Sequence, residues 1–227
     1  MVVENVGKLN LPLSEEQAQD LIKICTHSTY GRKIIQNNEL NINENVERVF
    51  DTEFRDSYEL DPFQFEIRHP EWQKEMNKLA NKAANEMASF DSKVYTKLSK
   101  LILYKKGSHF SRHIDRKKDE HMFGTLVVQL PSQYTGGEFI FHYYAEGFNR
   151  ENVHDLGQST GKSSSVMHYS SHFYDVEHEI KLITSGYRLV LVYLLCCKKK
   201  YDFYRDPMHW WRQRPYNHLD PDNELLD

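Results

Sequence analysis

The chain has 227 residues, with 29 Lys and Arg against 33 Asp and Glu, so its formal net charge is −4 when histidine is neutral. This near balance argues against a protein that coats nucleic acid or another polyanion, without excluding a local basic patch. Hydrophobic residues make up 39% and aromatic residues 13%, which is too many core-forming side chains for a disordered chain. The chain has 12 histidines but only 3 cysteines, so we exclude a four-cysteine zinc cluster and expect nitrogen and oxygen ligands at any metal site.

The sequence favours a reducing, intracellular location. Cys25, Cys196 and Cys197 do not form the spacing framework of a secreted disulfide scaffold. Residues 1–13 have no charged-then-apolar leader. The longest apolar run, residues 189–197, has about half the length of a membrane helix and is typical of a buried strand. We therefore expect a soluble cytoplasmic or nuclear protein with no membrane contact.

The N-terminal part predicts two helices with short strands between them. Ser14 and Gln17 form a capping-box signature before a helix over residues 14–26. Residues 37–45 are rich in asparagine and predict a loop, and residues 46–67 predict a strand, a turn at Asp61-Pro62 and a second strand. Pro70 suits the first residue of a second helix that ends near residue 88. Its apolar residues trace one stripe: Trp72, Met76, Leu79, Ala80, Ala83, Ala84 and Met87.

From residue 98 onward the chain reads as short strands separated by turn-forming residues. The expected strands are 101–104, 123–130, 138–144, 164–169, 176–183 and 187–197, with turns at 106–108, 135–137, 157–161 and 184–186. This order predicts a mainly β fold with flanking helices, a cupin-like double-stranded β-helix (jelly roll) with the N-terminal helices packed on its major sheet.

We expect a single domain over residues 1–227, in which residues 1–97 support a β core at 98–197 and residues 198–227 form a C-terminal tail. The tail contains Trp210 and Trp211 and is basic at first and acidic at its end. We interpret it as a segment that packs its aromatic side chains on the core. The alternative is a contact with a partner or peptide.

The first candidate site is His113-Ile114-Asp115, because residues i and i+2 of a strand point to the same face and can meet one ion. The pattern alone is weak, since His218-Leu219-Asp220 repeats it and His69-Pro70-Glu71 is related to it. Pro70 suits a helix start, and no strand follows His218. Several strands follow His113 and can supply a third ligand.

The downstream candidates for that ligand are His142, His154, His168, His172 and His178. We favour His178 because the strand that follows it opens with Arg188 and is otherwise apolar. A lone buried guanidinium costs several kcal/mol, so Arg188 must be paired. It either forms a buried salt bridge with Glu177, Glu179 or another acid, or its planar fork clamps a carboxylate ligand.

Two histidines and one carboxylate on one side of a metal are the facial triad of non-haem Fe(II) oxygenases. Residues 98–196 resemble the catalytic core of the Fe(II)/2-oxoglutarate-dependent dioxygenases, in the prolyl 4-hydroxylase-like branch. Five stretches carry the resemblance: Tyr104 before Gly107, Arg112-His113-Ile114-Asp115, Gly136-Gly137-Glu138-Phe139, His178-Glu179-Ile180 and Gly186-Tyr187-Arg188.

The resemblance implies roles for seven residues. His113, Asp115 and His178 would hold Fe(II), and Arg188 would pair with the C5 carboxylate of 2-oxoglutarate. Tyr104 would reach the co-substrate through its hydroxyl, or is a core strand tyrosine. Thr125 and Gln129 share one strand face and could give the C5 carboxylate a second hydrogen bond. Sensor-type prolyl hydroxylases have a tyrosine about where Gln129 stands, and collagen-type enzymes often have a lysine where Arg188 stands.

The resemblance implies an enzyme that hydroxylates a protein or peptide side chain, with proline as the leading guess. It would consume O2 and 2-oxoglutarate, release succinate and CO2, and be supported by ascorbate. Three alternatives stay open: oxidative demethylation of methyl-lysine or a methylated nucleobase, a jelly-roll binding module without turnover, and a cupin-like metal enzyme that uses no 2-oxoglutarate and adds His172 as a ligand. Six basic residues flank the metal loop, of which Arg112 and Arg116 could orient an acidic or polar substrate: Lys105, Lys106, Arg112, Arg116, Lys117 and Lys118.

Overall fold

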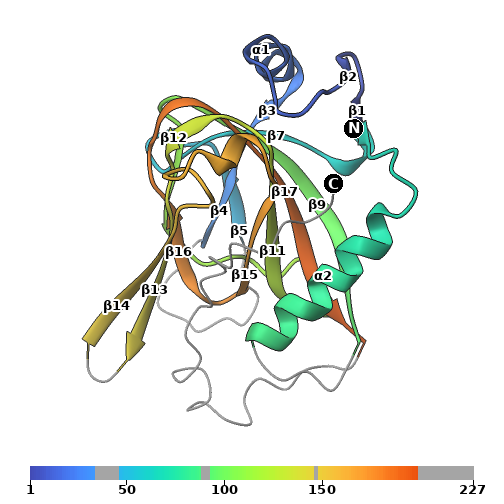
Figure 1. Ribbon diagram of the computed structural model, residues 1–227. Coiled ribbons are helices and arrows are strands. Elements are labelled where there is room, and N and C mark those ends of the chain that lie inside the picture. The colour runs from blue at the N-terminus through green and yellow to red at the C-terminus, as the bar shows by residue number, and fades with distance from the viewer. Residues whose placement is uncertain (34–45, 88–92, 146–147, 199–227) are drawn as a thin grey trace.

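The computed structural model describes residues 1–33, 46–87, 93–145 and 148–198. Most of its strands form two antiparallel sheets that face each other (Figure 1). The seven-stranded sheet has the order β15 (His168–Phe173), β11 (Met122–Leu130), β17 (Ile183–Cys197), β9 (Val94–Lys105), β7 (Tyr58–Leu60), β3 (Thr26–His27), and β12 (Tyr134–Gly136) pairs with β17 outside this order. The five-stranded sheet has the order β14 (Phe148–His154), β13 (Phe139–Ala145), β16 (Glu177–Ile180), β10 (His109–His113), β6 (Arg55–Asp56). The predicted mainly β jelly roll is confirmed.

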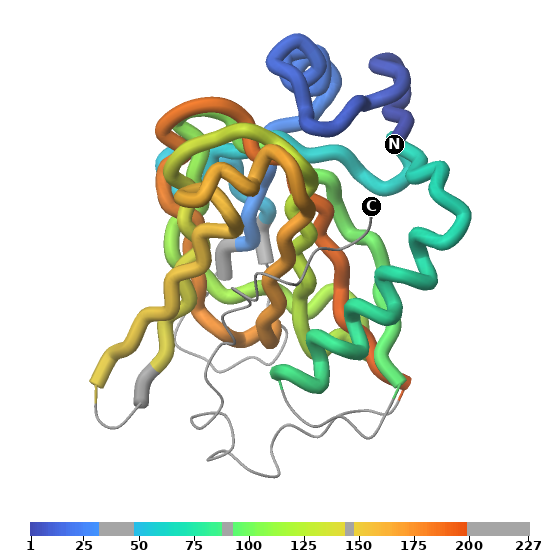
Figure 2. The backbone as a smooth tube through the Cα atoms, in the orientation of Figure 1, coloured from blue at the N-terminus to red at the C-terminus, as the bar shows by residue number. Residues whose placement is uncertain are grey.

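The two predicted helices are present and pack as expected. Helix α2 (Trp72–Met87) runs along the outer face of the seven-stranded sheet, opposite the five-stranded sheet (Figures 1 and 2). Its apolar stripe is buried, and three of the buried residues are alanines, which let the helix approach the sheet closely: Met76, Leu79, Ala80, Ala83 and Ala84. Helix α1 (Glu15–Ile24) buries Ala18 and Leu21 in the same core.

The helix starts differ in detail from the prediction. Ser14 accepts a hydrogen bond from the backbone N–H of Gln17 at 3.2 Å, so the predicted N-cap forms. The reciprocal half of the capping box is absent, because the Gln17 carboxamide bonds the backbone of Lys8 and Asn10 instead. Helix α2 begins at Trp72 rather than Pro70, since the chain first makes a turn in which His69 accepts from the N–H of Trp72.

The remaining N-terminal elements form two small sheets. Strands β1 (Val2–Val3), β2 (Gly7–Lys8) and β8 (Phe65–Glu66) form one, and β4 (Tyr30–Lys33) and β5 (Val46–Val49) form the other. The predicted turn at Asp61-Pro62 is the short 3-10 helix η1 (Pro62–Gln64) between β7 and β8. The asparagine-rich stretch 37–45 and the tail with Trp210 and Trp211 lie outside the described residues.

Several of the predicted strand boundaries are wrong: β9 begins at Val94 rather than at residue 101, and β16 ends at Ile180 rather than at residue 183. The strand expected at 164–169 begins only at His168, after the 3-10 helix η2 (Lys162–Ser164). The turn expected at 184–186 lies inside β17, which is continuous from Ile183 and pairs with β12 at Gly186. Gly186 has φ +70°, and a side chain there would collide with the carbonyl of Gln133, so the glycine permits a local bend rather than a chain reversal. In the β core, strands β10, β12 and β14 are additional to those predicted, and β12 overlaps the turn expected at 135–137. The short N-terminal strands β1 to β4 were not predicted either.

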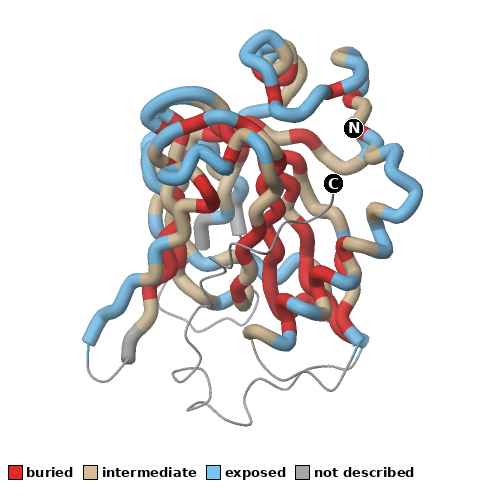
Figure 3. The backbone as a smooth tube through the Cα atoms, in the orientation of Figure 1, coloured by how far each residue is buried: buried red, intermediate tan, exposed pale blue. Residues whose placement is uncertain are grey.

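The interior between the two sheets positions the candidate site. Burial is concentrated in the strands of the large sheet and in α2 (Figure 3). Strand β11 is buried along its whole length because one face meets the helix core and the other faces the interior. Val127 lies on the interior face, and by alternation so do Thr125 and Gln129, which are both buried. No helix in the described part of the chain is long and apolar enough to cross a membrane.

Candidate active site

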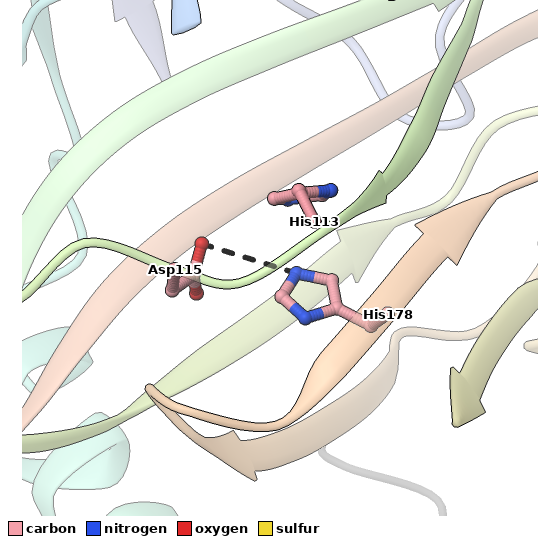
Figure 4. Close-up of side chains that lie close together, drawn as sticks. All are labelled: His113, Asp115 and His178. Atoms are coloured by element: carbon pink, nitrogen blue, oxygen red, sulfur yellow. Dashed lines mark ion pairs between the residues drawn. The ribbon is translucent and has the colours of Figure 1, made fainter. Parts of the chain in front are cut away.

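Three side chains of the predicted triad converge in the interior of the jelly roll. His113 ends strand β10, Asp115 follows it, and His178 lies on β16, which pairs with β10 so that the two histidines are opposite each other. One potential ligand atom from each residue lies within 4.8 Å of the other two. Figure 4 shows the carboxylate and the two rings grouped around one point, with a dashed line from Asp115 to His178.

Both histidines are oriented by a hydrogen bond through Nδ1. His113 Nδ1 lies 2.7 Å from the carbonyl of Ser111, and His178 Nδ1 lies 2.8 Å from the carbonyl of Val176. A carbonyl can only accept, so Nδ1 carries the proton and Nε2 presents its lone pair to the centre. Burial lowers the pKa of His113 to about 4 and the pKa of His178 well below its ordinary value. Both rings are therefore neutral at pH 7 and suited to bind a metal.

The carboxylate of Asp115 is held by two donors on one oxygen. Oδ2 accepts from Thr125 Oγ1 at 2.5 Å and from His172 Nε2 at 3.2 Å, while Oδ1 lies 3.9 Å from His178 Nε2. Burial on its own would raise the pKa of Asp115, but the hydrogen bond from His172 and the nearby histidines hold the pKa well below its usual value. An ionised carboxylate with two neutral imidazoles is a donor set that suits Fe(II) and similar divalent ions.

His113 is also fixed by a stack of rings. The ring of Phe110 lies parallel to it, with centroids 3.4 Å apart and an interplanar angle of 18°. The guanidinium of Arg55 lies 4.5 Å from the centre of the Phe110 ring and donates to Ser57 Oγ at 3.1 Å. It is also 3.5 Å from a carboxylate oxygen of Glu59. This stack sets the plane of the His113 ring, and no local sequence pattern indicated it.

Arg188 is fully buried on β17. Its Nε donates to Gln129 Oε1 at 3.2 Å and its Nη1 donates to the carbonyl of Gly137 at 3.1 Å. Nη2 is buried and has no hydrogen-bond partner within the described ranges. The guanidinium therefore keeps one edge available for a further acceptor.

The salt-bridge alternative for Arg188 is wrong for the two acids that the sequence suggested. Glu177 pairs with Arg112, and Glu179 lies 3.0 Å from His142 Nε2 and 2.9 Å from Lys181 Nζ. No carboxylate among the described residues pairs with Arg188. The ion pair with Glu177 also compensates the charge of Arg112, which the sequence had offered as a contact for an acidic substrate.

Gln129 and Thr125 have partners other than a co-substrate. The Gln129 carboxamide donates to the carbonyl of Leu156 at 3.0 Å and accepts from the Tyr134 hydroxyl at 2.7 Å as well as from Arg188. Its polar atoms are therefore used to orient the guanidinium. Thr125 donates its only hydroxyl proton to Asp115. Thr125 therefore has no donor left for a C5 carboxylate, whereas the Gln129 amide nitrogen carries two hydrogens and uses one of them for Leu156.

Tyr104 lies directly opposite Arg188 in the β9–β17 pairing, with its ring centre 5.7 Å from the guanidinium carbon. Its ring belongs to the interior core, as the structural alternative predicted. Burial raises the pKa of its hydroxyl, so the group stays a proton donor at neutral pH. The hydroxyl makes no hydrogen bond within the described part of the chain, and it can still serve a ligand.

Sequence reasoning missed several residues of this interior. Tyr134, on β12, lies 5.8 Å from the Arg188 guanidinium carbon and supports Gln129. It stands just before the double glycine of the recognised motif, which is the only signal that could have indicated it. Of the other histidines, His142 lies between Glu151 and Glu179 at 3.2 and 3.0 Å, and this arrangement is structural.

No protein-family model and no curated protein matches the sequence. The structure is similar to a Pseudomonas putida prolyl-4-hydroxylase, with 18% identity, 65% of this chain and 76% of that chain covered and a TM-score of 0.42. It is also similar to a 2OG-Fe(II) oxygenase family oxidoreductase from Burkholderia pseudomallei (14% identity, 80% and 78% covered, TM-score 0.41). A third similar structure is a prolyl hydroxylase from Trichoplax adhaerens in complex with a hypoxia inducible factor peptide fragment. It has 14% identity and a TM-score of 0.45, with 85% of this chain and 83% of that chain covered.

Proposed function

We propose that this protein is an Fe(II)- and 2-oxoglutarate-dependent dioxygenase. The observation that carries the proposal is that two features lie together between the two sheets. One is the group of His113, Asp115 and His178, whose potential ligand atoms lie close together. The other is Arg188, which is fully buried and has no acidic partner in the described residues. The first fits a metal with open positions, and the second fits the far carboxylate of a ligand bound there.

The metal would be held by His113 Nε2, His178 Nε2 and Asp115. Three ligands on one side leave the opposite side for a bidentate ligand and for O2. When bound, Fe(II) supplies the one-electron and dioxygen chemistry that side chains lack. The protein supplies neutral imidazoles, an ionised carboxylate and an interior lined by buried side chains.

Arg188 would bind the C5 carboxylate of 2-oxoglutarate. A buried charge without a partner is costly, and a dicarboxylate entering the jelly roll supplies the missing acceptor to Nη2. Gln129 and the Gly137 carbonyl hold the other nitrogen atoms, so the guanidinium is oriented before the ligand arrives. Tyr104 would add a hydrogen bond from its hydroxyl.

For the substrate we propose a protein or peptide side chain, with proline first, as the sequence resemblance implies. Ile114, between the two ligands of the metal loop, is 54% exposed and offers an apolar contact at this surface. Oxidative demethylation is the second candidate reaction, and release of formaldehyde from a methylated substrate would favour it. A binding module without turnover is less consistent with the site, because it does not need two neutral histidines aimed at an ionised aspartate.

The test is turnover of the co-substrate. Purified protein with Fe(II), ascorbate and 2-oxoglutarate should release succinate slowly without a substrate, and faster with a substrate peptide. Asp115→Ala should release none, although the fold should persist because Asp115 is outside the apolar core. Succinate release at the same rate from wild type and Asp115→Ala would refute the proposal.

A further inference from the structure

His172 is a buried histidine beside the candidate metal site that the ligand triad does not include. It lies on β15, directly opposite Thr125 of β11 in the strand pairing, and it is 5% exposed. Its Nε2 lies 3.2 Å from Asp115 Oδ2. Its Nδ1 is buried and has no hydrogen-bond partner in the described ranges. Among the described residues, Asp115 is therefore the only hydrogen-bond partner of this ring.

The surroundings of His172 make an imidazole costly there. The rings of Phe139 and Phe141 lie 5.6 and 5.1 Å from it, and the ring of His178 lies 4.3 Å away. A buried polar atom without a hydrogen-bond partner destabilises the folded protein. An apolar side chain would avoid that cost among these neighbours, so the imidazole brings one feature that an apolar residue cannot, the hydrogen bond to Asp115.

The direction of that hydrogen bond shows what His172 can do. Oδ2 of Asp115 is a carboxylate oxygen that also accepts from Thr125 Oγ1, so it is the acceptor and His172 Nε2 is the donor that carries the proton. A protonated nitrogen has no lone pair for a metal. The orientation therefore argues against the cupin-like alternative in which His172 is a fourth ligand, at least through the nitrogen that faces the site.

We propose that His172 is a positioning residue that, together with Thr125, fixes Oδ2 of Asp115 so that Oδ1 alone faces the metal. The two donors come from neighbouring strands of the large sheet, at paired positions, and meet on the same oxygen. This clamp prevents the carboxylate from rotating to bind through both oxygens and keeps a coordination position open. The inference rests on the proposed function only in requiring a divalent metal at the triad.

The test measures the affinity of the metal-free protein for Mn(II) by calorimetry, without 2-oxoglutarate and without turnover. His172→Leu keeps the volume but removes the donor, and loss of such a support typically weakens metal binding about 10- to 100-fold. His172→Gln can place an amide N–H near the former Nε2 and should restore affinity to within about threefold of wild type. Thr125→Val should also weaken Mn(II) binding, because it removes the other donor.

His168→Leu is the matched control. His168 lies on the same strand and the same face as His172, and its Nε2 is likewise buried without a partner in the described part of the chain, but it does not contact Asp115. It should leave the Mn(II) affinity unchanged. Urea unfolding of each metal-free variant shows whether a loss of affinity is a loss of folded protein.

Two results would overturn the inference: His172→Leu that binds Mn(II) as tightly as wild type, or His172→Gln that loses as much affinity as His172→Leu. The second result would mean that the imidazole acts by something other than donation to Asp115. Failure of the wild-type protein to bind Mn(II) would instead refute the proposed function, and the inference with it.

Discussion

Replacing Arg188 with methionine should separate ligand binding from stability. In the ligand-free protein this arginine has no acidic partner in the described residues, so its removal leaves no buried charge behind. Methionine can fill most of the space as a flexible apolar side chain. We therefore expect Arg188→Met to fold normally and to lose most of its affinity for 2-oxoglutarate.

The magnitudes follow from the contacts. The substitution removes two hydrogen bonds, to Gln129 Oε1 and to the Gly137 carbonyl, but it also removes an unpaired buried charge. Gln129 keeps its bonds to Tyr134 and Leu156. These effects oppose each other, and the free energy of unfolding should change by no more than about 2 kcal/mol, less than the ~3–5 kcal/mol seen when one partner of a buried ion pair is removed. Loss of a buried charged contact to a ligand costs ~2–5 kcal/mol, which weakens binding roughly 30-fold to several thousand-fold.

The assays are urea unfolding of the metal-free protein and calorimetric binding of 2-oxoglutarate to the Mn(II) protein. Arg55→Met is the matched control for the stability arm, because Arg55 is also buried but is paired with Glu59 and bonded to Ser57. It should destabilise the protein more than Arg188→Met does. The reasoning fails if Arg188→Met loses more than about 3 kcal/mol of stability while its affinity for 2-oxoglutarate stays at the wild-type value.

Three further predictions concern the support of Gln129 by Tyr134, the protonation of His113 and the packing of helix α2. Tyr134→Phe removes a 2.7 Å hydrogen bond to Gln129 and should weaken 2-oxoglutarate binding about 5- to 10-fold, a cost of roughly 1 kcal/mol, with Mn(II) affinity unchanged; an unchanged 2-oxoglutarate affinity would exclude this support. Burial lowers the pKa of His113 from 6.5 to about 4, so between these pH values the unfolded chain binds more protons than the folded protein. The free energy of unfolding of the metal-free protein should therefore fall by up to about 3 kcal/mol as the pH falls through this window. Urea unfolding at several pH values should show a shallower dependence in His113→Leu than in wild type, and equal slopes would count against the buried neutral ring. Leu79→Ala, in the apolar stripe of α2, should lower the free energy of unfolding in urea by ~2–5 kcal/mol and leave the affinity for 2-oxoglutarate nearly unchanged. A loss of 2-oxoglutarate affinity without a loss of stability would contradict this.

The features that the sequence predicted correctly are those with a local period. The apolar stripe of α2 and the apolar run of β17 follow from helix and strand spacing, and each is buried as expected. His113 and Asp115 converge as the i and i+2 spacing predicted, although β10 ends at His113 and Asp115 lies just beyond the strand. Arg188 could be singled out because a charge interrupts an apolar strand.

The features that the sequence missed depend on pairing between distant strands. His172 meets Asp115 only because β15 pairs with β11 in a register that places it opposite Thr125, and no local pattern reports that register. The stack of Arg55 on Phe110 likewise needs β6 to pair with β10. The turn expected at 184–186 was wrong because the same residue types allow a bend inside a continuous strand.

The central claim is that the triad holds a metal whose open positions take a 2-oxo acid while Arg188 holds its far carboxylate. Anaerobic titration of 2-oxoglutarate into the Fe(II) protein tests this most directly, because a bidentate 2-oxo acid on Fe(II) gives a visible charge-transfer band. The account predicts a saturable band for the wild-type protein, no band with glutarate, which lacks the keto group, and a much higher concentration for half-saturation in Arg188→Met. Absence of the band from Fe(II)-loaded wild type, or saturation of Arg188→Met at the wild-type concentration, would contradict it.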